Sequence, residues 1–342
     1  MKKQSLKRCD MEFTGLVSKY PTKRQLTDAE LALRLDQKIC ASLNPHYQLC
    51  VIKLNSTYLE SVDKWFGWKG MISAVSIIVI SMFSMLYFGL VHVALTREEG
   101  GGVSNEDLLV LIGAAVMIFP VLGVALWALR KESFSYTHYP MRFNRKTRMI
   151  HVFRTNGTVL SISWDKVFFT MGHLELWNEW EVRGHVLEPD STTVSETFAL
   201  SYIGSLHSSH SANAGVHSLP AKDFVRAHWE FIRRYMEDGP EAVSEQIQFC
   251  MPVDINREPF RGSIERIFAN VAGAPFVIYW MLFPICSVVS LFRLFAMFTS
   301  KIPQWPDDLE ANNQVDPSDP HAIRGAADGE RIRDSAEFRT FK

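Results

Sequence analysis

Two groups of side chains in this chain belong to types that catalyse reactions or bind metal ions. In the first group, Glu175, Glu179 and Glu181 lie close together in the stretch LELWNEWEV. Two neighbouring carboxyl groups can act as general acid and general base when their surroundings separate their pKa values. Because these glutamates alternate with Leu and Trp as they would on a strand, the pattern favours ordinary strand positions over catalysis.

In the second group, His207, His210 and His217 lie in the stretch LHSSHSANAGVH. Imidazole rings bind zinc or nickel, but such sites need further ligands held on ordered elements. This stretch is rich in Ser, Ala and Gly, as loops are, and the five cysteines include no CxxC pair. The chain also contains no GxSxG, Walker or HExxH motif. We therefore predict no catalytic residue, no metal site and no cofactor.

A third group of side chains is basic and suggests binding rather than catalysis. Arg142, Arg145, Lys146 and Arg148 follow closely after a long apolar run. Near an inner leaflet each cation would contribute about 1 kcal/mol to the attraction for anionic lipid head groups. These four residues are our membrane-surface candidates, and an ordinary solvated turn is the alternative. The formal net charge of −1 does not indicate nucleic acid as a partner.

The elements that position these residues begin with a predicted transmembrane hairpin over residues 71–129. Residues 71–95 and 108–129 contain no Asp, Glu, Lys or Arg, and each run can span a hydrocarbon core of about 30 Å. The connection TREEGGGVSNED is acidic, whereas both outer flanks are basic. The positive-inside rule therefore places both flanks in the cytoplasm. We expect the hairpin to be an anchor, since His92 is the one residue among Asp, Glu, Lys, Arg and His within the two runs.

A third apolar block, residues 266–299, is interrupted by Pro275, Pro284 and Arg293. The block is too short for two spans. One span would place the C-terminus outside, whereas a re-entrant or interfacial helical hairpin would keep it inside. Basic flanks and the central Pro284 favour the hairpin. Residues 300–342 are rich in Pro, Asp, Asn and Gly without an apolar period, and we predict that they are disordered.

Between these apolar blocks, residues 130–265 are predicted to form a cytoplasmic β-rich domain. Strand-like runs occur at 149–153, 159–164, 167–170, 174–177, 180–187 and 193–200, and Asn156-Gly157 predicts a hairpin. Helical spacing over residues 220–238 predicts an amphipathic helix that caps the sheet. The expected fold class is α+β, a β-meander with a C-terminal capping helix as in pleckstrin-homology domains. Residues 1–70 are expected to be an N-terminal cytoplasmic segment, with a short helix at 26–38 capped by Thr27.

The chain resembles an uncharacterised bacterial inner-membrane family, a domain of unknown function whose members are often encoded near type VI secretion genes. The resemblance covers most of residues 50–265. It rests on LNSTYLESVDKWFGWKG, RFNRKTRMIHVFRTNGTVLSISWDKV, GHVLEPDSTTVSETFAL and WEFIRRYMEDGPEAV. It implies a multi-pass protein of the bacterial inner membrane with a role in interbacterial competition. It implies no catalytic residues.

The resulting hypothesis is a membrane-anchored interaction protein that presents its cytoplasmic domain to a protein partner in an immunity or accessory role. Trp164 and Trp177 are the candidates for partner contacts, because Trp is enriched at interfaces, although Trp in a strand is more often a core residue. A secreted effector that perturbs membranes is one alternative. An enzyme acting at the membrane surface is another.

Overall fold

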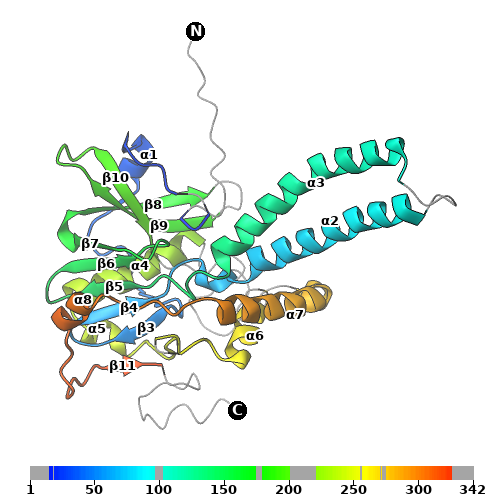
Figure 1. Cartoon of the computed structure of the whole chain (residues 1–342). Helices are drawn as coiled ribbons and strands as arrows, with labels where there is room; N and C mark the ends of the chain where they lie inside the picture. Colours follow the sequence, from blue (N-terminus) through cyan, green and yellow to red (C-terminus); the bar gives the residue numbers. More distant parts are fainter. Residues whose placement is uncertain are drawn as a thin grey trace.

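The computed structural model describes residues 15–17, 19–96, 103–174, 179–200, 221–254, 256–269, 271 and 275–325. Over these residues the chain forms a mixed α+β domain with two antiparallel sheets. Three long apolar helices project from one end of the domain (Figure 1). The expected α+β class is therefore confirmed.

The larger sheet has six strands in the order β11-β3-β4-β5-β6-β7. The strands are β3 (Val51–Leu54), β4 (Tyr58–Ser61), β5 (Met141–Asn144), β6 (Met149–Phe153), β7 (Val159–Ser163) and β11 (Ile323–Arg324). The predicted hairpin at Asn156-Gly157 is present, and Gly157 adopts a φ of +84° that favours glycine. The predicted strands at 149–153 and 159–164 are confirmed as β6 and β7.

The smaller sheet has five strands in the order β1-β10-β9-β8-β2. They are β1 (Arg24–Gln25), β2 (Arg34–Leu35), β8 (Val167–Leu174), β9 (Glu179–Leu187) and β10 (Thr193–Ala199). Between β1 and β2 lies α1 (Asp28–Ala32), with the predicted Thr27–Glu30 capping box at its start. This helix is shorter than the predicted 26–38 because the chain turns into β2 at once.

The core lies where both sheets meet α4 (Ala221–Glu237), the predicted capping helix. Trp164, at the 3-10 turn η2 (Trp164–Lys166) between the sheets, is completely buried. Its ring stacks on that of Trp229 in α4 with centroids 5.4 Å apart, and Phe169 packs against both rings. A short helix, α5 (Glu241–Ser244), follows α4.

The apolar hairpin is inserted between two neighbouring strands of the larger sheet. Strands β4 and β5 pair directly, with Tyr58 opposite Asn144 and Ser61 opposite Met141. The chain between them forms the 3-10 turn η1 (Phe66–Trp68), α2 (Met71–Thr96) and α3 (Asn105–Glu132). The expected division into an N-terminal segment (1–70) and a separate domain (130–265) is therefore not what the structure shows. Strands from both sides of the hairpin build one sheet.

The third apolar block forms two antiparallel helices, α6 (Phe260–Ala269) and the longer α7 (Phe276–Thr299). Phe268, near the end of α6, packs on Phe283 of α7, while Arg257, before α6, lies over the ring of Phe298. Both outer ends of the pair therefore lie at the domain. Helix α7 continues through Pro284, so the chain reverses before α7 rather than at this proline.

Residues 300–325 are ordered against the larger sheet, contrary to the predicted disorder of 300–342. They include α8 (Asp307–Asn312) and β11, which pairs with β3. Leu309 and Ile323 are buried, and the Asp319 carboxylate accepts hydrogen bonds from the Ser56 N–H and hydroxyl. A few well-spaced apolar residues thus dock a segment whose composition is otherwise typical of disorder. Residues 326–342 lie outside the described part of the chain.

Candidate functional site

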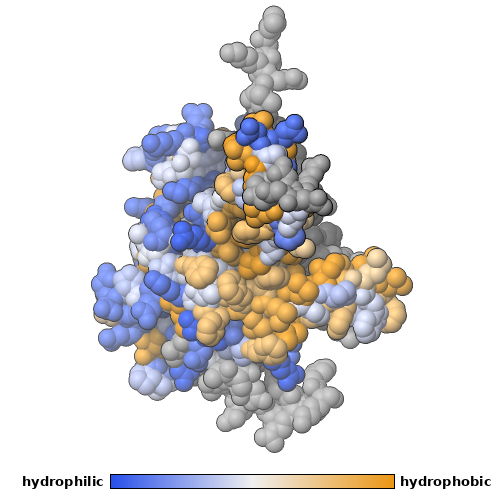
Figure 2. All heavy atoms as spheres, turned by 45° about the vertical axis from the view of Figure 1, so that its right-hand side comes forward, coloured by the Kyte–Doolittle hydropathy of each residue, from blue (hydrophilic) through white to orange (hydrophobic). Residues whose placement is uncertain are grey.

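The most distinctive surface of the molecule is the apolar exterior of its three long helices. Each of α2, α3 and α7 is long and apolar enough to cross a membrane, and only 11%, 11% and 33% of their most apolar windows are buried. Figure 2 shows hydrophobic residues gathered on these helices, with hydrophilic residues over much of the domain. Large side chains such as Met85, Leu109 and Phe276 are 81%, 71% and 76% exposed.

Buried polar contacts join α2 to the end of α3 where the two helices leave the domain. The Glu132 carboxylate accepts hydrogen bonds of 2.6 Å from both the N–H and the hydroxyl of Ser73. The Lys69 ammonium donates to the carbonyl oxygens of Glu132 and Tyr136 at 2.9 and 2.6 Å. These bonds satisfy groups that would otherwise be unpaired at the helix ends.

A buried arginine attaches α7 to the same place. The Arg293 guanidinium pairs with the Glu258 carboxylate at 2.7 Å and is completely buried. It also donates to the carbonyl oxygens of Phe66 and Lys69 at 2.8 and 3.1 Å. All three apolar helices are therefore fixed to the domain by charged or polar groups at their domain ends.

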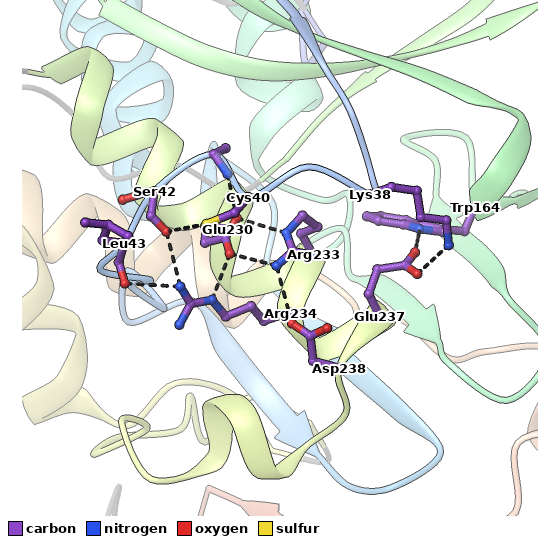
Figure 3. A network of polar contacts seen from close by, with 11 residues as sticks. Lys38, Cys40, Ser42, Leu43, Trp164, Glu230, Arg233, Arg234, Glu237 and Asp238 are labelled. Carbon is purple, nitrogen blue, oxygen red and sulfur yellow. Dashed lines mark hydrogen bonds and ion pairs between the residues drawn. The ribbon is translucent and has the colours of Figure 1, made fainter.

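The opposite end of the domain carries a second polar network, drawn in Figure 3, which fixes the loop before β3 to α4. The Glu230 carboxylate accepts bonds from Arg233, Arg234 and the Ala41 N–H, and Arg234 also donates to the carbonyl oxygens of Ser42 and Leu43. Burial acts to raise the pKa of Glu230, but the bonds from both guanidinium groups and from the Ala41 N–H outweigh it and lower the pKa to about 2. The loop is thus attached to α4 by main-chain and side-chain hydrogen bonds.

A second group of contacts beside this network includes two of our sequence candidates. Glu237 accepts bonds from Lys38 and from the Trp164 indole at 2.8 Å (Figure 3), and from Arg148 at 2.7 Å. Arg148 also pairs with Asp165. Trp164 is therefore a core residue with its indole N–H bonded inside the domain, and it offers no ring surface to a partner. Trp177 lies outside the described residues.

The four basic candidates do not form one cluster. Arg142 is completely buried, pairs with Glu60 and Glu310, and lies close to the rings of Tyr58 and Trp305, so it cannot reach a lipid head group. The three others lie on or beside the β5–β6 turn, and only Lys146 is fully exposed.

This turn also lies at the wrong end of the sheet for a membrane-surface site. Strand β5 begins near the end of α3 and runs away from the helices, so the turn is about 13 Å further out at 3.3 Å per residue. Screening would weaken attraction to a membrane at the helix roots over that distance.

Among the three glutamates of the first group, Glu181 lies in a buried cluster of ion pairs that its sequence pattern did not predict. It is buried, pairs with Lys64, accepts a 2.6 Å bond from Arg183 and lies 3.5 Å from the Tyr20 hydroxyl. Burial acts to raise the pKa of Glu181, and the charges of Lys64 and Arg183 outweigh it and lower the pKa. Because its pKa is lowered, Glu181 is ionised at neutral pH and does not serve as a general acid there.

Beside this cluster lies a cavity of about 430 Å³ between the two sheets, with Lys64, Trp65, Phe153 and Phe198 in its lining. Within the residues that the structure describes, no group of His, Cys, Asp and Glu could hold a metal ion.

Glu175 and the three histidines at 207, 210 and 217 lie outside those residues, as does the side chain of Glu179. Sequence reasoning missed the pairing of Lys64 with Glu181, because 117 residues separate them.

Comparison with known proteins gives one match. A family of unknown function, DUF6708, matches residues 118–317, from the middle of α3 to beyond α8. This is more than half of the chain. No curated protein and no solved structure matches the chain.

Proposed function

The chain belongs to DUF6708, a family of unknown function, and we propose from its structure that it is a membrane-anchored interaction protein. In this proposal α2 and α3 span the bacterial inner membrane as a hairpin, and α6 and α7 enter it as a re-entrant pair. The α+β domain then stands at the cytoplasmic face and engages a protein partner.

The observation that carries the proposal is the exposed apolar surface of the three helices. Soluble monomers rarely expose contiguous apolar patches larger than several hundred Å². The 26 residues of α2 and the 28 of α3 have lengths of about 39 and 42 Å at 1.5 Å per residue, enough to cross a hydrocarbon core of about 30 Å. A lipid environment would remove this surface from water without any change in the fold.

Charges at the helix roots support the orientation. Arg130, Lys131, Arg257 and Lys301 are all exposed near the domain ends of the apolar helices. Glu106 and Asp107 lie instead at the far end of the hairpin, in the first turn of α3. A basic root and an acidic tip favour a cytoplasmic domain under the positive-inside rule.

The loop between β2 and β3, residues 36–50, is here called the distal loop, and its exposed apolar side chains support an interaction role. Ile39 and Leu43 are 64% and 85% exposed, although the loop that carries them is fixed by Glu230 and Arg234. Exposed apolar side chains on a preorganised loop lose little entropy on binding, which favours recognition of a protein. We also propose that the two sheets and the capping helix α4 form a pleckstrin-homology-like module, an analogy of fold that by itself implies no ligand. The version that we propose is an immunity or accessory protein associated with type VI secretion.

Crosslinking and mass spectrometry on gently solubilised native membranes test this proposal. We expect the protein to remain in the pellet after alkaline carbonate extraction, and we expect a secretion component or toxin to crosslink near the distal loop. Release into the carbonate supernatant would contradict the anchor. Crosslinks to lipid and self alone, together with growth arrest on induced expression, would favour a membrane-perturbing effector instead.

A further inference from the structure

Arg266 in α6 is a half-buried cation whose hydrogen-bond acceptor among the described residues is a weak one. The guanidinium donates to the thioether sulfur of Met251 at 2.7 Å and lies 5.6 Å from the centre of the Phe66 ring. A guanidinium has five N–H donors, and a thioether is a weak acceptor. Within the described part of the chain, no carboxylate forms an ion pair with Arg266.

The nearest source of negative charge is already committed to other partners. The Glu258 carboxylate accepts a 2.7 Å bond from Arg293 and a 3.0 Å bond from the Ser263 hydroxyl, both to the same oxygen. A guanidinium is protonated throughout the physiological pH range. Arg266 therefore remains charged at neutral pH in a place that lacks a matching anion.

Two further cations lie on the same short segment. Arg257 and Arg261 are exposed, and Arg261 pairs only at the surface, with Glu265. Phe260 and Phe298 are 63% and 77% exposed beside them. Arg266 itself lies at the level of η1, the turn that leads directly into α2, because its guanidinium reaches Phe66. Aromatic and basic residues at the foot of apolar helices are typical of the lipid head-group layer.

We propose that Arg266, with Arg257 and Arg261 at the rim, binds the phosphate group of an anionic phospholipid beside η1, where α2 leaves the domain. The guanidinium fork matches a phosphate oxygen pair, and the added rim charges favour a net negative lipid over a zwitterionic one. This inference rests on the proposed membrane anchor. It moves the head-group site from the β5–β6 turn to the opposite end of the domain.

The test compares thermal unfolding of the full chain in phosphatidylcholine nanodiscs with unfolding in discs that also contain phosphatidylglycerol. We expect phosphatidylglycerol to raise the Tm of the wild type by about 3 °C or more. Arg266→Met keeps the length and the Phe66 contact but removes the charge, and we expect it to lose this rise while keeping its Tm in phosphatidylcholine. Lys146→Gln, at the distal turn, is the matched control and should keep the full rise.

Glycerol 1-phosphate added to phosphatidylcholine discs distinguishes the lipid from free phosphate, and we expect it to give no rise. An equal rise for Arg266→Met and the wild type would overturn the inference, as would loss of the rise in Lys146→Gln.

If Arg266→Met does not fold, native mass spectrometry of the wild type decides. Preferential retention of phosphatidylglycerol supports the site, and equal retention of both lipids contradicts it. Failure of the wild type to enter discs at all would instead overturn the anchor.

Discussion

The backbone of Arg293 in α7 lies directly against Gly70, the residue that precedes α2. A Cβ atom built on Gly70 would lie 2.5 Å from the Arg293 Cα, and Gly70 has a φ of +101°. Both facts require glycine at this position, since the neighbouring atom is main chain and the conformation is left-handed. This contact brings the domain ends of α2 and α7 together. Among the described glycines, Gly70 is the one whose Cβ position lies against α7.

Substitution of Gly70 by alanine should therefore separate α7 from α2. We expect Gly70→Ala to lower the free energy of unfolding by about 2–4 kcal/mol, from left-handed strain and steric overlap together. Thermal unfolding in detergent measures this effect. Gly113→Ala in α3 is the control, because nothing lies within 4 Å of its Cβ position, and it should be neutral or slightly stabilising. Equal stability of the two variants would contradict the contact.

The pair of Arg293 and Glu258 gives a second prediction. Because both side chains are buried, Arg293→Met leaves an unpaired carboxylate and Glu258→Gln leaves an unpaired guanidinium. We expect each single change to cost about 3–5 kcal/mol and the double variant to cost clearly less than the sum. A double-mutant cycle measured by denaturant unfolding gives the coupling. The exposed pair Arg261–Glu265 should give a coupling of about 0–1 kcal/mol in the same assay.

The ordered C-terminal segment predicts that two truncations differ. Ending the chain after Lys301 removes buried Leu309 and Ile323 and takes Glu310 away from Arg142. We expect this truncation to cost at least about 3 kcal/mol, from lost apolar burial alone. Ending the chain after Gly325 retains every contact described for this segment and should leave the Tm unchanged. Limited proteolysis and thermal unfolding measure both, and similar behaviour of the two truncations would contradict the docking of this segment.

The Glu230 network predicts a pH dependence of stability. The folded-state pKa of about 2 lies below the ordinary value of 4.5. The contribution of Glu230 is therefore complete above about pH 4.5 and is lost as the pH falls toward 2. The stability difference between wild type and Glu230→Gln should be largest at neutral pH and shrink over that range. Glu245→Gln, at an exposed position, is the control, and its stability should differ little from the wild type at every pH. A stability difference for Glu230→Gln that does not change with pH would contradict the network.

Local patterns in the sequence were sufficient for the helices and hairpins but not for their assembly. The uncharged runs predicted α2 and α3, and Asn156-Gly157 predicted the β6–β7 hairpin, because each signal lies within one element. The pairing of Tyr58 with Asn144 could not be predicted, since the whole apolar hairpin separates the two strands. Strand β4 is buried throughout, so it lacks the alternation that marks a half-exposed strand.

Buried charges were the least predictable part of the candidate site. Arg142 reads as a surface cation in the sequence, yet Glu60 and Glu310 neutralise it inside the domain. The sequence pattern indicates that Glu181 is an ordinary polar strand position, yet in the structure it pairs with Lys64, which is distant in the sequence. The partners of such residues are distant in sequence, so only the tertiary structure distinguishes them from solvated side chains.

Cysteine accessibility in intact cells tests the membrane anchor most directly. In a variant whose five native cysteines are replaced by alanine, single cysteines are placed at Val103, Lys146 or Lys301 and exposed to a membrane-impermeant maleimide. The anchor predicts labelling of Val103→Cys in intact cells, and labelling of Lys146→Cys and Lys301→Cys only after permeabilisation. Labelling of Lys146→Cys in intact cells, or recovery of the protein in the soluble fraction, would contradict a cytoplasmic domain held by a transmembrane hairpin.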